Sequence, residues 1–373
     1  MRVAILANVP VWTLPDLAYL RHAGHYATWL EPLIPVFNAA QPAVDVHWIT
    51  MCKQADRPIT HQAHGQTFHI LPRGSMAVSM CSGYLAETAR IRSVIRRIEP
   101  DVVHAWGSED VYGIAAARSG ISKSLFTLQG CLTEYLRLLG GSFLFRVQCL
   151  YEQPTIRRYR HATAESPAAA ELLKRIHPGL EVELVDYGVN REFFNTEWNP
   201  APEPNVAFVG SVSKRKGIID LVEVARRPEL SHITFHILGD GPLCGELKAS
   251  SPANVRWHGK CGRQDVADHL SRAWALVMPT YSDTGPTVIK EARVIGLPVI
   301  TTTGAGASSY IRNEQSGHVI TPGDQETLAR ALLSICTSRE HCRKLGKVDW
   351  DDQRKLLHPA TTAAKFHKIY QSL

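Results

Sequence analysis

The chain has 373 residues, about two and a half times a typical ~150-residue domain, so its length predicts two domains. Hydrophobic residues make up 45% and charged residues 20%, which is close to the average for globular chains and excludes a collagen-like, mucin-like or largely disordered protein. The net charge of +6 is weaker than the clustered charge of a dedicated DNA-binding protein. We therefore expect no nucleic-acid partner, whereas an anionic ligand or membrane surface fits.

The cysteines and the apolar segments bear on the compartment. The eight cysteines are scattered without a C-x-x-C pair, as is typical of reduced thiols in a cytoplasm. The apolar start of the chain is short and is broken by Pro10 and Pro15, so it predicts a buried strand rather than a signal peptide. No run of about 18 apolar residues is present, and we expect any membrane contact to be peripheral, at the inner face.

Short apolar runs alternate with longer amphipathic segments, which is typical of βα units around parallel sheets. The predicted strands of the first half are 3–6, 44–49, 101–105, 125–129, 162–164 and 182–185. The predicted strands of the second half are 206–209, 233–238, 255–259, 275–279 and 298–301. The Pro-rich stretch 195–205 between the two series predicts a linker or boundary. The expected fold is α/β, with two doubly wound parallel-sheet domains and a ligand cleft between them.

Two segments of the first half carry further hypotheses. His61 and His64, with Cys52 and His69, suggest a metal, but they form no closed ligand set, so we predict a histidine cluster in a loop and strand without a metal. The predicted helix 136–150 is interrupted by two glycines and followed by three arginines in 157–160. It fits either an anionic bilayer or lipid-linked acceptor, or a core-facing helix with a basic edge.

The second half opens on a basic turn. A strand runs into Gly210 and Ser211, and Lys214, Arg215 and Lys216 precede an amphipathic helix. Basic side chains beside a helix N-terminus can bind a diphosphate, although such runs are more often solvated faces. The next glycine-spaced loop, 237–245, is similar to a dinucleotide fingerprint, but the following strand ends without the acidic residue that would hold a ribose. A nicotinamide enzyme is therefore not favoured.

The segment 277–300 is the most informative. A buried strand ends, Asp283 lies in the following turn, and Gly285 and Pro286 open a helix. The first backbone N–H groups of that helix, near Thr287 and Val288, are available to an anion. Glu291 shares a helix face with Thr287, roughly 6 Å further along the axis. A ligand with a diphosphate between two polyhydroxy groups would meet a carboxylate, an anion site and a second carboxylate in order.

Late in the chain, Asp349 and Asp351 form the D-x-D pattern of metal-dependent transferases. They lie in a Lys/Arg-rich helical tail, so we interpret them as a surface helix cluster. No metal and no cofactor other than the co-substrate is expected.

In this order, the segments of residues 185–335 resemble the donor-binding half of the family 4 retaining glycosyltransferases of GT-B fold. The matching segments are 210–217, 239–242, 255–259, 304–311 and 317–324, together with the acidic pair Asp283 and Glu291. The first half is similar at 101–106, 127–130 and 187–193. The resemblance implies an acceptor-binding domain over 1–188, onto which a C-terminal helix 358–373 packs back, and a donor-binding domain over 189–357.

The resemblance also implies roles for single residues. Lys216, with Lys214 or Arg215, would neutralise the donor diphosphate, Glu291 would hold the ribose and Asp283 the sugar hydroxyls. The nucleobase would lie against the backbone near Lys260. Asp283, Glu291 and Lys216 are thus the predicted catalytic residues. The predicted donor-binding residues are Gly210, Ser211, Lys214, Arg215, Lys216, Gly239, Lys260, Asp283, Gly285, Thr287, Val288 and Glu291.

This chain departs from the family pattern at several positions. Ser211 replaces the usual arginine of the first loop, and Asp283 replaces the commoner glutamate. Gln129 stands where many members place a histidine, and an amide cannot act as a general base. The early Gly-Gly pair is missing, so Gly24 with His25, or the turn 8–14, would substitute. Gln129 and His25 are the acceptor-side candidates.

These features predict a retaining, metal-independent glycosyltransferase that moves a sugar from a UDP- or GDP-linked donor to a hydroxyl of a glycan, lipid-linked or small-molecule acceptor, in surface polysaccharide or glycoconjugate synthesis. A non-catalytic nucleotide-sugar-binding protein on the same fold is the alternative from another class, because Ser211 and Gln129 depart from the pattern. A nucleotide-sugar epimerase shares the fold and is the third hypothesis.

Overall fold

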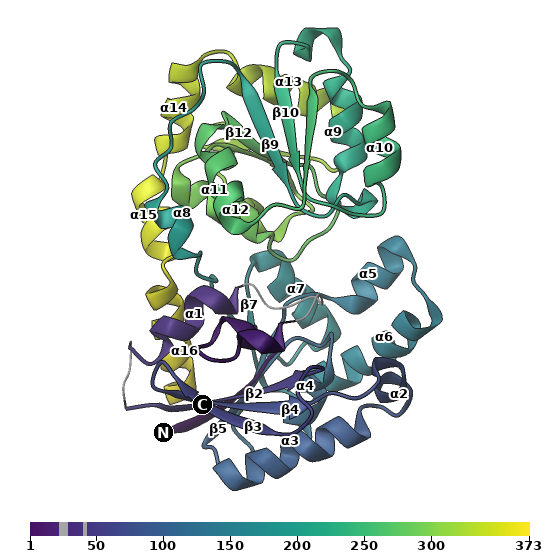
Figure 1. The fold of residues 1–373 in the computed structure, drawn as a ribbon, viewed down its shortest axis with the longest axis vertical. Helices are drawn as coiled ribbons and strands as arrows, with labels where there is room; N and C mark the ends of the chain where they lie inside the picture. The colour runs from purple at the N-terminus through teal and green to yellow at the C-terminus, as the bar shows by residue number, and fades with distance from the viewer. Residues whose placement is uncertain (22–28, 40–42) are drawn as a thin grey trace. The chain divides into compact units, whose positions relative to one another are not determined.

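The computed structural model describes residues 1–21, 29–39 and 43–373. They divide into two compact units (Figure 1). Unit 1 comprises Met1–Gly188 and Pro359–Leu373, and unit 2 comprises Val189–His358. Each unit is built around one sheet whose strands are mainly parallel, which confirms the predicted α/β fold with two Rossmann-like domains.

The sheet of unit 1 has the order β3-β4-β2-β1-β5-β6-β7-β8. Its strands are β1 (Arg2–Leu6), β2 (Asp45–Cys52), β3 (Ile59–Ala63), β4 (Gln66–Pro72), β5 (Val102–Trp106), β6 (Ser124–Thr127), β7 (His161–Ala164) and β8 (Glu181–Leu184). All pairs are parallel except β3 with β4, an antiparallel hairpin that the sequence analysis did not predict. His64 and Gly65 form its two-residue turn with φ of 52° and 69°, the positive values that a type I′ turn requires.

Helices cover both faces of this sheet because successive strand residues alternate between them. The helices are α1 (Leu30–Phe37), α2 (Met76–Cys81), α3 (Leu85–Ile98), α4 (Val111–Ala117), α5 (Leu132–Leu139), α6 (Phe143–Ile156), α7 (Pro167–Ile176) and α16 (Pro359–Ser372). Val3 and Ile5 join a core with α1 and α16, whereas Ala4 and Leu6 join the opposite core with α3, α4, α6 and α7. Among the described residues, no helix combines the length and apolar composition that a membrane crossing requires.

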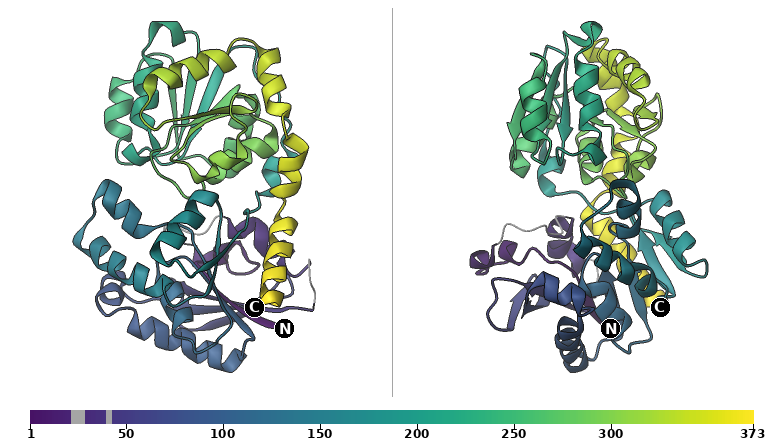
Figure 2. Two further views of the ribbon diagram at one scale, coloured as in Figure 1. Left: turned by 180° about the vertical axis from the view of Figure 1, so that it is seen from behind. Right: turned by 90° about the vertical axis from the view of Figure 1, so that its right-hand side faces the viewer.

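The C-terminal helix α16 lies beside the N-terminal elements of unit 1 (Figure 2). The Tyr370 hydroxyl lies 2.7 Å from Nδ1 of the buried His104 on β5. Lys365 forms a 2.6 Å ion pair with Asp186, and His367 Nε2 lies 2.6 Å from the carbonyl oxygen of Phe37 on α1. The last residues of the chain therefore complete the core of the first unit.

The sheet of unit 2 is entirely parallel, with the order β11-β10-β9-β12-β13-β14. Its strands are β9 (Asn205–Val209), β10 (Thr234–Leu238), β11 (Val255–Gly259), β12 (Ala275–Met278), β13 (Val299–Thr302) and β14 (Gly317–Ile320). The helices are α8 (Arg191–Asn195), α9 (Ile218–Ala225), α10 (Cys244–Ser250), α11 (Arg263–Arg272), α12 (Thr287–Ile295), α13 (Gln325–Ile335), α14 (Arg339–Lys347) and α15 (Trp350–Leu356). Helix α9 packs with α13, and α12 packs with α8, α11 and α15.

The Pro-rich stretch 195–205 lies inside unit 2, so its interpretation as the boundary was wrong. The Trp198 indole N–H donates to the carbonyl oxygen of Ala273 at 2.9 Å, and the backbone N–H groups of Asn199 and Ala201 donate to the carbonyl oxygens of Ser271 and Arg272. The prolines exclude regular structure, but these bonds fix the segment along the end of α11.

The D-x-D pattern lies at the start of helix α15, as predicted. Asp349 precedes the helix with φ of 57°, and Asp351 lies in its first turn. Asp349 is mostly buried rather than exposed, because it forms an ion pair with Arg312. The Trp350 indole N–H donates to the carbonyl oxygen of Val294 on α12 at 2.9 Å, so this corner is structural.

Candidate functional site

The strand order of unit 2 reverses between β9 and β12, and ligands of open parallel sheets bind beyond the carboxyl ends of the strands at such a point. The loops that follow these two strands are joined directly. The backbone N–H of Tyr281, after β12, donates to the carbonyl oxygen of Arg215, after β9, at 2.8 Å. The backbone N–H of Val212 donates to the carbonyl oxygen of Asp240, which follows β10, at 3.0 Å. Three predicted segments therefore meet at one edge of the sheet.

Two glycines permit this close approach. Gly217 has φ of 70°, and a Cβ there would lie 1.9 Å from the carbonyl oxygen of Pro279. Gly239 has φ of 148°, and its Cβ would lie 1.8 Å from the carbonyl oxygen of Gly210. A side chain at either position would separate the loops. These glycines therefore permit the close packing of the loops as well as the positive φ values of the turns.

Asp283 is the electrostatic centre of this edge. Its Oδ2 accepts from the ammonium of Lys216 and, at 3.2 Å, from Arg215 Nη1, which also donates to the carbonyl oxygen of Ser282 at 2.8 Å. Burial acts to raise the pKa of Asp283, but the charges of Lys216 and then Arg215 outweigh it and hold the pKa below its usual value. The carboxylate is therefore ionised and the two cations are positioned without a ligand.

The start of α12 lies beside Asp283. Pro286 precedes the first helical residue, Thr287, as predicted, and the N–H of Gly285 points to Asp283 Oδ1 at 3.3 Å. The N–H groups of Thr287 and Val288 have no acceptor within their own helix, because the first turn of any helix lacks one. With the helix dipole, these groups can bind an anion next to the two cations.

Glu291 lies one turn further along α12 and faces different neighbours. Burial raises its pKa to about 7, Arg263 and Lys290 partly oppose this, and Glu192 adds to it. Arg263, on α11, also lies 3.6 Å from Glu192 of α8. Glu291 thus belongs to a charged group with α8 and α11 rather than to the basic loop.

Of the remaining predicted residues, those of unit 2 follow the strands at the carboxyl edge of its sheet, and one residue of unit 1 lies outside the described residues. Gly210 has φ of 152°, the side chains of Ser211 and Lys214 are exposed, and the exposed Lys260 follows β11. The acceptor-side candidate His25 lies outside the described residues.

Unit 1 places Gln129 beside a carboxyl group that the sequence analysis missed. Its strand order reverses between β1 and β5, and Glu109 follows β5. A Cβ at Gly107 would lie 2.2 Å from Glu109 Oε2 and 3.1 Å from Gln129 Oε1, so both side chains adjoin this glycine. Burial raises the pKa of Glu109 to about 7, and Glu152 adds to it, while backbone N–H groups including that of Gly130 oppose it.

The neighbouring Glu152 is a structural group. It accepts from the N–H groups of Leu132 and Thr133 at 2.7 and 2.8 Å, in the first turn of α5, and from the hydroxyl of Ser108 at 2.7 Å. A carboxylate at a helix N-terminus is stabilised by those donors. Glu152 thus serves the start of α5, whereas burial raises the pKa of Glu109 to about 7. No sequence motif identified Glu109 as a candidate site residue. Its position just after the predicted strand 101–105 is the one signal that could have identified it.

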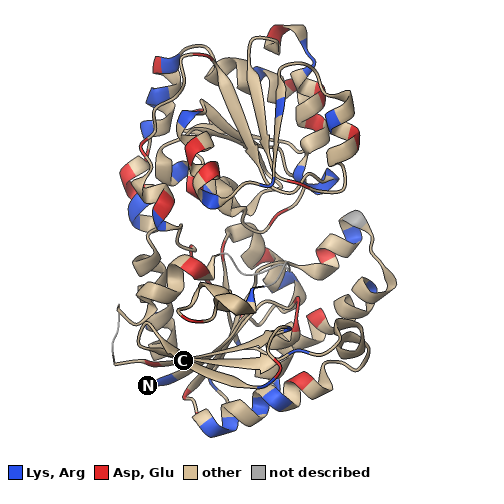
Figure 3. Ribbon diagram, viewed as in Figure 1, with Lys and Arg blue, Asp and Glu red and all other residues tan. Residues whose placement is uncertain are grey.

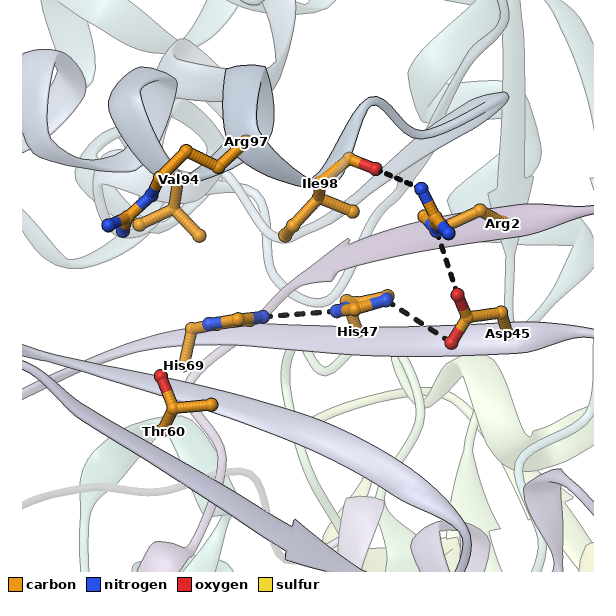
Figure 4. A pocket seen from close by; sticks show the side chains of 8 residues that line it. All are labelled: Arg2, Asp45, His47, Thr60, His69, Val94, Arg97 and Ile98. Atoms are coloured by element: carbon orange, nitrogen blue, oxygen red, sulfur yellow. Dashed lines mark hydrogen bonds and ion pairs between the residues drawn. The ribbon is translucent and has the colours of Figure 1, made fainter.

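A cavity of about 330 Å³ opens at the other end of this sheet (Figure 4). A chain of polar contacts runs along it, from His69 to His47 at 3.0 Å, to Asp45 at 3.2 Å, and to Arg2. The cavity lies at the amino ends of β1 and β2, whereas open parallel sheets bind ligands at the carboxyl ends. Burial, then His47 and Arg97, lower the pKa of His69 to about 4, so its ring is neutral.

Both halves of the chain match family models. Residues 190–348 match the model described as "Glycosyl transferases group 1", and residues 17–142 match "Glycosyl transferase 4-like". The chain is 28% identical over 316 residues to the sulfoquinovosyl transferase of Arabidopsis thaliana, covering 77% of this chain and 60% of that protein. It is 24% identical over 358 residues to the GDP-mannose-dependent alpha-mannosyltransferase of Mycolicibacterium smegmatis, covering 91% and 90%. The aligned part thus spans about three fifths of the Arabidopsis protein.

Solved structures share the fold. Sucrose-phosphate synthase from Thermosynechococcus elongatus superposes with a TM-score of 0.79 at 18% identity, covering 100% of this chain and 98% of that one. Anabaena HepE in complex with UDP-glucose gives 0.71 at 14% identity, covering 100% of both chains. The matches together support a glycosyltransferase of GT-B fold.

A pH effect on stability follows from Glu291. Its pKa in the folded chain lies above the ordinary glutamate value of 4.5. The native state therefore binds more protons than the unfolded state between pH 4.5 and 7, and the unfolding free energy falls as pH rises through that window. We expect Glu291→Gln to remove about 1–3 kcal/mol of this fall. Urea unfolding of the ligand-free protein at pH 5 to 8, followed by tryptophan fluorescence, measures it. The exposed Glu246→Gln on α10 is the control and should leave the slope unchanged. Equal slopes in wild type and Glu291→Gln would contradict the assignment.

Proposed function

We propose that the chain is a retaining glycosyltransferase that transfers a sugar from a UDP- or GDP-linked donor to a hydroxyl of a glycan, lipid-linked or small-molecule acceptor, in surface polysaccharide or glycoconjugate synthesis. The observation that carries the proposal is the group of Asp283, Lys216 and Arg215 at the switch point of unit 2, beside the start of α12. Ordered cations and helix N–H groups stabilise the negative charge that develops on a departing diphosphate.

Each residue then has a chemical role. The bond between the anomeric carbon and the diphosphate oxygen breaks, and Lys216, Arg215 and the N–H groups near Thr287 hold the leaving anion. The acceptor oxygen bonds to the same face of the sugar, and its proton passes to an oxygen of the departing phosphate. Asp283 accepts hydrogen bonds from sugar hydroxyls, and Glu291 holds the ribose. In this scheme no step requires a metal ion.

The relatives support a nucleotide-sugar donor without selecting the nucleotide. The mycobacterial relative is named for GDP-mannose, and the Anabaena structure contains UDP-glucose. Asp283 is one methylene shorter than the commoner glutamate, and Ser211 lacks the charge of the usual arginine. We therefore expect the donor-sugar preference of this chain to differ from that of relatives with the usual residues.

Removing the charges of the site tests the proposal. We expect Lys216→Met to lower kcat/KM for transfer by about 100-fold or more, as loss of one donor to a developing anion does. Glu291→Gln should lower kcat/KM by about 10-fold, because the amide accepts weaker hydrogen bonds from the ribose hydroxyls than the carboxylate does. Product formation from a panel of UDP- and GDP-sugars measures this, with circular dichroism as a check on folding. The exposed Lys248→Met on α10 is the matched control for Lys216→Met and should behave as wild type.

The outcomes separate the alternatives. UDP or GDP binding by calorimetry without hydrolysis or transfer, over a broad acceptor panel, would favour the non-catalytic binding protein. Interconversion of the donor sugar without an acceptor would favour an epimerase. Wild-type turnover in both site variants would show that the residue assignment is wrong.

Glu109 extends the proposal to the acceptor. Beside Gln129, its carboxylate would accept a hydrogen bond from the acceptor hydroxyl, and with a pKa of about 7 it ionises over the working range. We expect kcat/KM for the acceptor to rise with pH through about 7. Glu109→Gln should remove this pH dependence and raise the KM for the acceptor by about 10-fold, which corresponds to the loss of one charge-assisted hydrogen bond. Donor KM should not change. An unaltered pH profile in Glu109→Gln would contradict the role.

A peripheral membrane contact of unit 1 is the last part of the proposal. Val78 on α2, Leu85 on α3, and Phe143 and Leu150 on α6 are 64 to 74% exposed, and α2 packs against both α3 and α6. Basic residues follow along α3 (Figure 3). Exposed apolar side chains with flanking cations bind anionic bilayers.

We expect the full chain to sediment with phosphatidylglycerol vesicles and Phe143→Asp with Leu150→Asp to abolish this. Leu184→Asp, an exposed leucine on β8, is the control and should still sediment. Retention of the double variant on the vesicles, or absence of sedimentation by the wild type, would exclude this surface as a membrane contact.

A further inference from the structure

Three histidines from three separate elements converge in unit 2. His236 lies on β10, His258 on β11 and His269 on α11. One ring nitrogen of each lies within 4.8 Å of the others, and His236 Nδ1 is 2.9 Å from His258 Nε2. The ring centroids of His258 and His269 are 4.3 Å apart. Within the described residues, no other group of three or more His, Cys, Asp or Glu side chains has this arrangement.

The fold brings the rings together although they are far apart in the sequence. β10 and β11 are neighbours, and an irregularity in their pairing between Ile237 and Leu238 shifts His258 relative to His236. Helix α11 supplies the third ring, and its centroid is 5.5 Å from that of His236. Figure 1 shows β10 and α11 in the same unit. His236 and His269 are half-buried, and His258 is exposed, so the group is open to solvent on one side.

Burial of the group favours neutral rings. Burial first, then His258, His269 and Arg256, lower the pKa of His236 to about 4. Burial also lowers the pKa values of His258 and His269, while Asp265 and Asp268 partly oppose this at His269. A neutral imidazole has one lone pair available for a metal ion. Three neutral rings carry three such lone pairs. The short contact between His236 and His258 can occupy one of them.

We propose that His236, His258 and His269 bind one divalent transition-metal ion, of the Zn²⁺ class, with solvent in the fourth position. Three imidazoles and an open position form a recurrent zinc site, and Zn–N distances of about 2.0–2.1 Å place the nitrogens of a tetrahedral site roughly 3.3 Å apart. The ring nitrogens, within 4.8 Å of one another, would move closer together on binding, and His258 is exposed at the surface. Imidazole ligands also suit Cu²⁺ and Ni²⁺, but not the oxygen-seeking Mg²⁺ or Ca²⁺.

The consequence of binding is structural. The ion would join edge strand β11 to β10 and to α11, and the loop 260–262, which carries Lys260, connects β11 to α11. A ligand that binds only the folded state stabilises it in proportion to the logarithm of its concentration over Kd. The three histidines are not among the residues to which the proposed function assigns a role in transfer, so this site stands apart from that function.

The test is a zinc titration of the full chain after treatment with a chelator. We expect one equivalent of Zn²⁺ by competition with a chromophoric chelator, and a rise in the thermal midpoint on its addition. His258→Ala and His269→Ala should weaken the affinity by at least about 10-fold, the loss that removal of an outer-shell partner alone causes, and should cancel the thermal shift.

Two controls make the result specific. His47→Ala removes one ring of the two-histidine pair of unit 1, and His232→Ala removes an exposed histidine of unit 2, so both should bind zinc as the wild type does. His258 is exposed, so loss of binding in its variant without loss of folding supports the site. Absence of stoichiometric binding, equal affinity in His258→Ala, or loss of affinity in His47→Ala would overturn the proposal.

Discussion

The candidate site depends on the ion pairs that Asp283 makes with Lys216 and Arg215. The carboxylate follows β12 and the cations follow β9, which are the two strands where the sheet of unit 2 changes direction. A buried acid on its own would take up a proton, and buried cations on their own would repel one another. Each group is therefore kept charged by the others. The positions of the basic loop, the turn after β12 and the start of α12 follow from this balance.

Most of the fold could be predicted from the sequence because parallel strands are buried on both faces. Such strands read as short continuous apolar runs, as at 275–279, and they stand out between amphipathic helices. The hairpin β3–β4 could not be found in this way, because it alternates half-buried and exposed residues and turns at His64 and Gly65 rather than at a common hairpin pair. The stretch 195–205 was misinterpreted because its prolines indicate only that regular structure is excluded. They do not indicate which groups form hydrogen bonds with the backbone of the segment.

The candidate site divides in the same way. Asp283, Lys216 and Glu291 could be found because their loops carry glycine and proline at fixed offsets from strands and a helix start. Glu109 and the three histidines 236, 258 and 269 could not, because they become neighbours only through strand order and helix packing. A single sequence contains no local trace of such contacts. The switch point between β1 and β5 identifies Glu109, and the pairing of β10 with β11 beside α11 identifies the three histidines.

The same physical cause, burial of a carboxyl group, has opposite results in the two kinds of position. At Asp283 two cations lie close enough to outweigh it, and the pKa falls; at Glu291 and Glu109 the opposing charges or hydrogen bonds are too weak, and the pKa rises to about 7. A permanently ionised acid suits a group that must hold cations in place before an anionic ligand arrives. Glu291 and Glu109, whose pKa values lie near 7, can instead change their charge with a small change in surroundings when a ligand binds. The division of the three carboxyl groups between fixed charge and adjustable charge therefore follows from which loop or helix supplies each one and from the groups that surround it there.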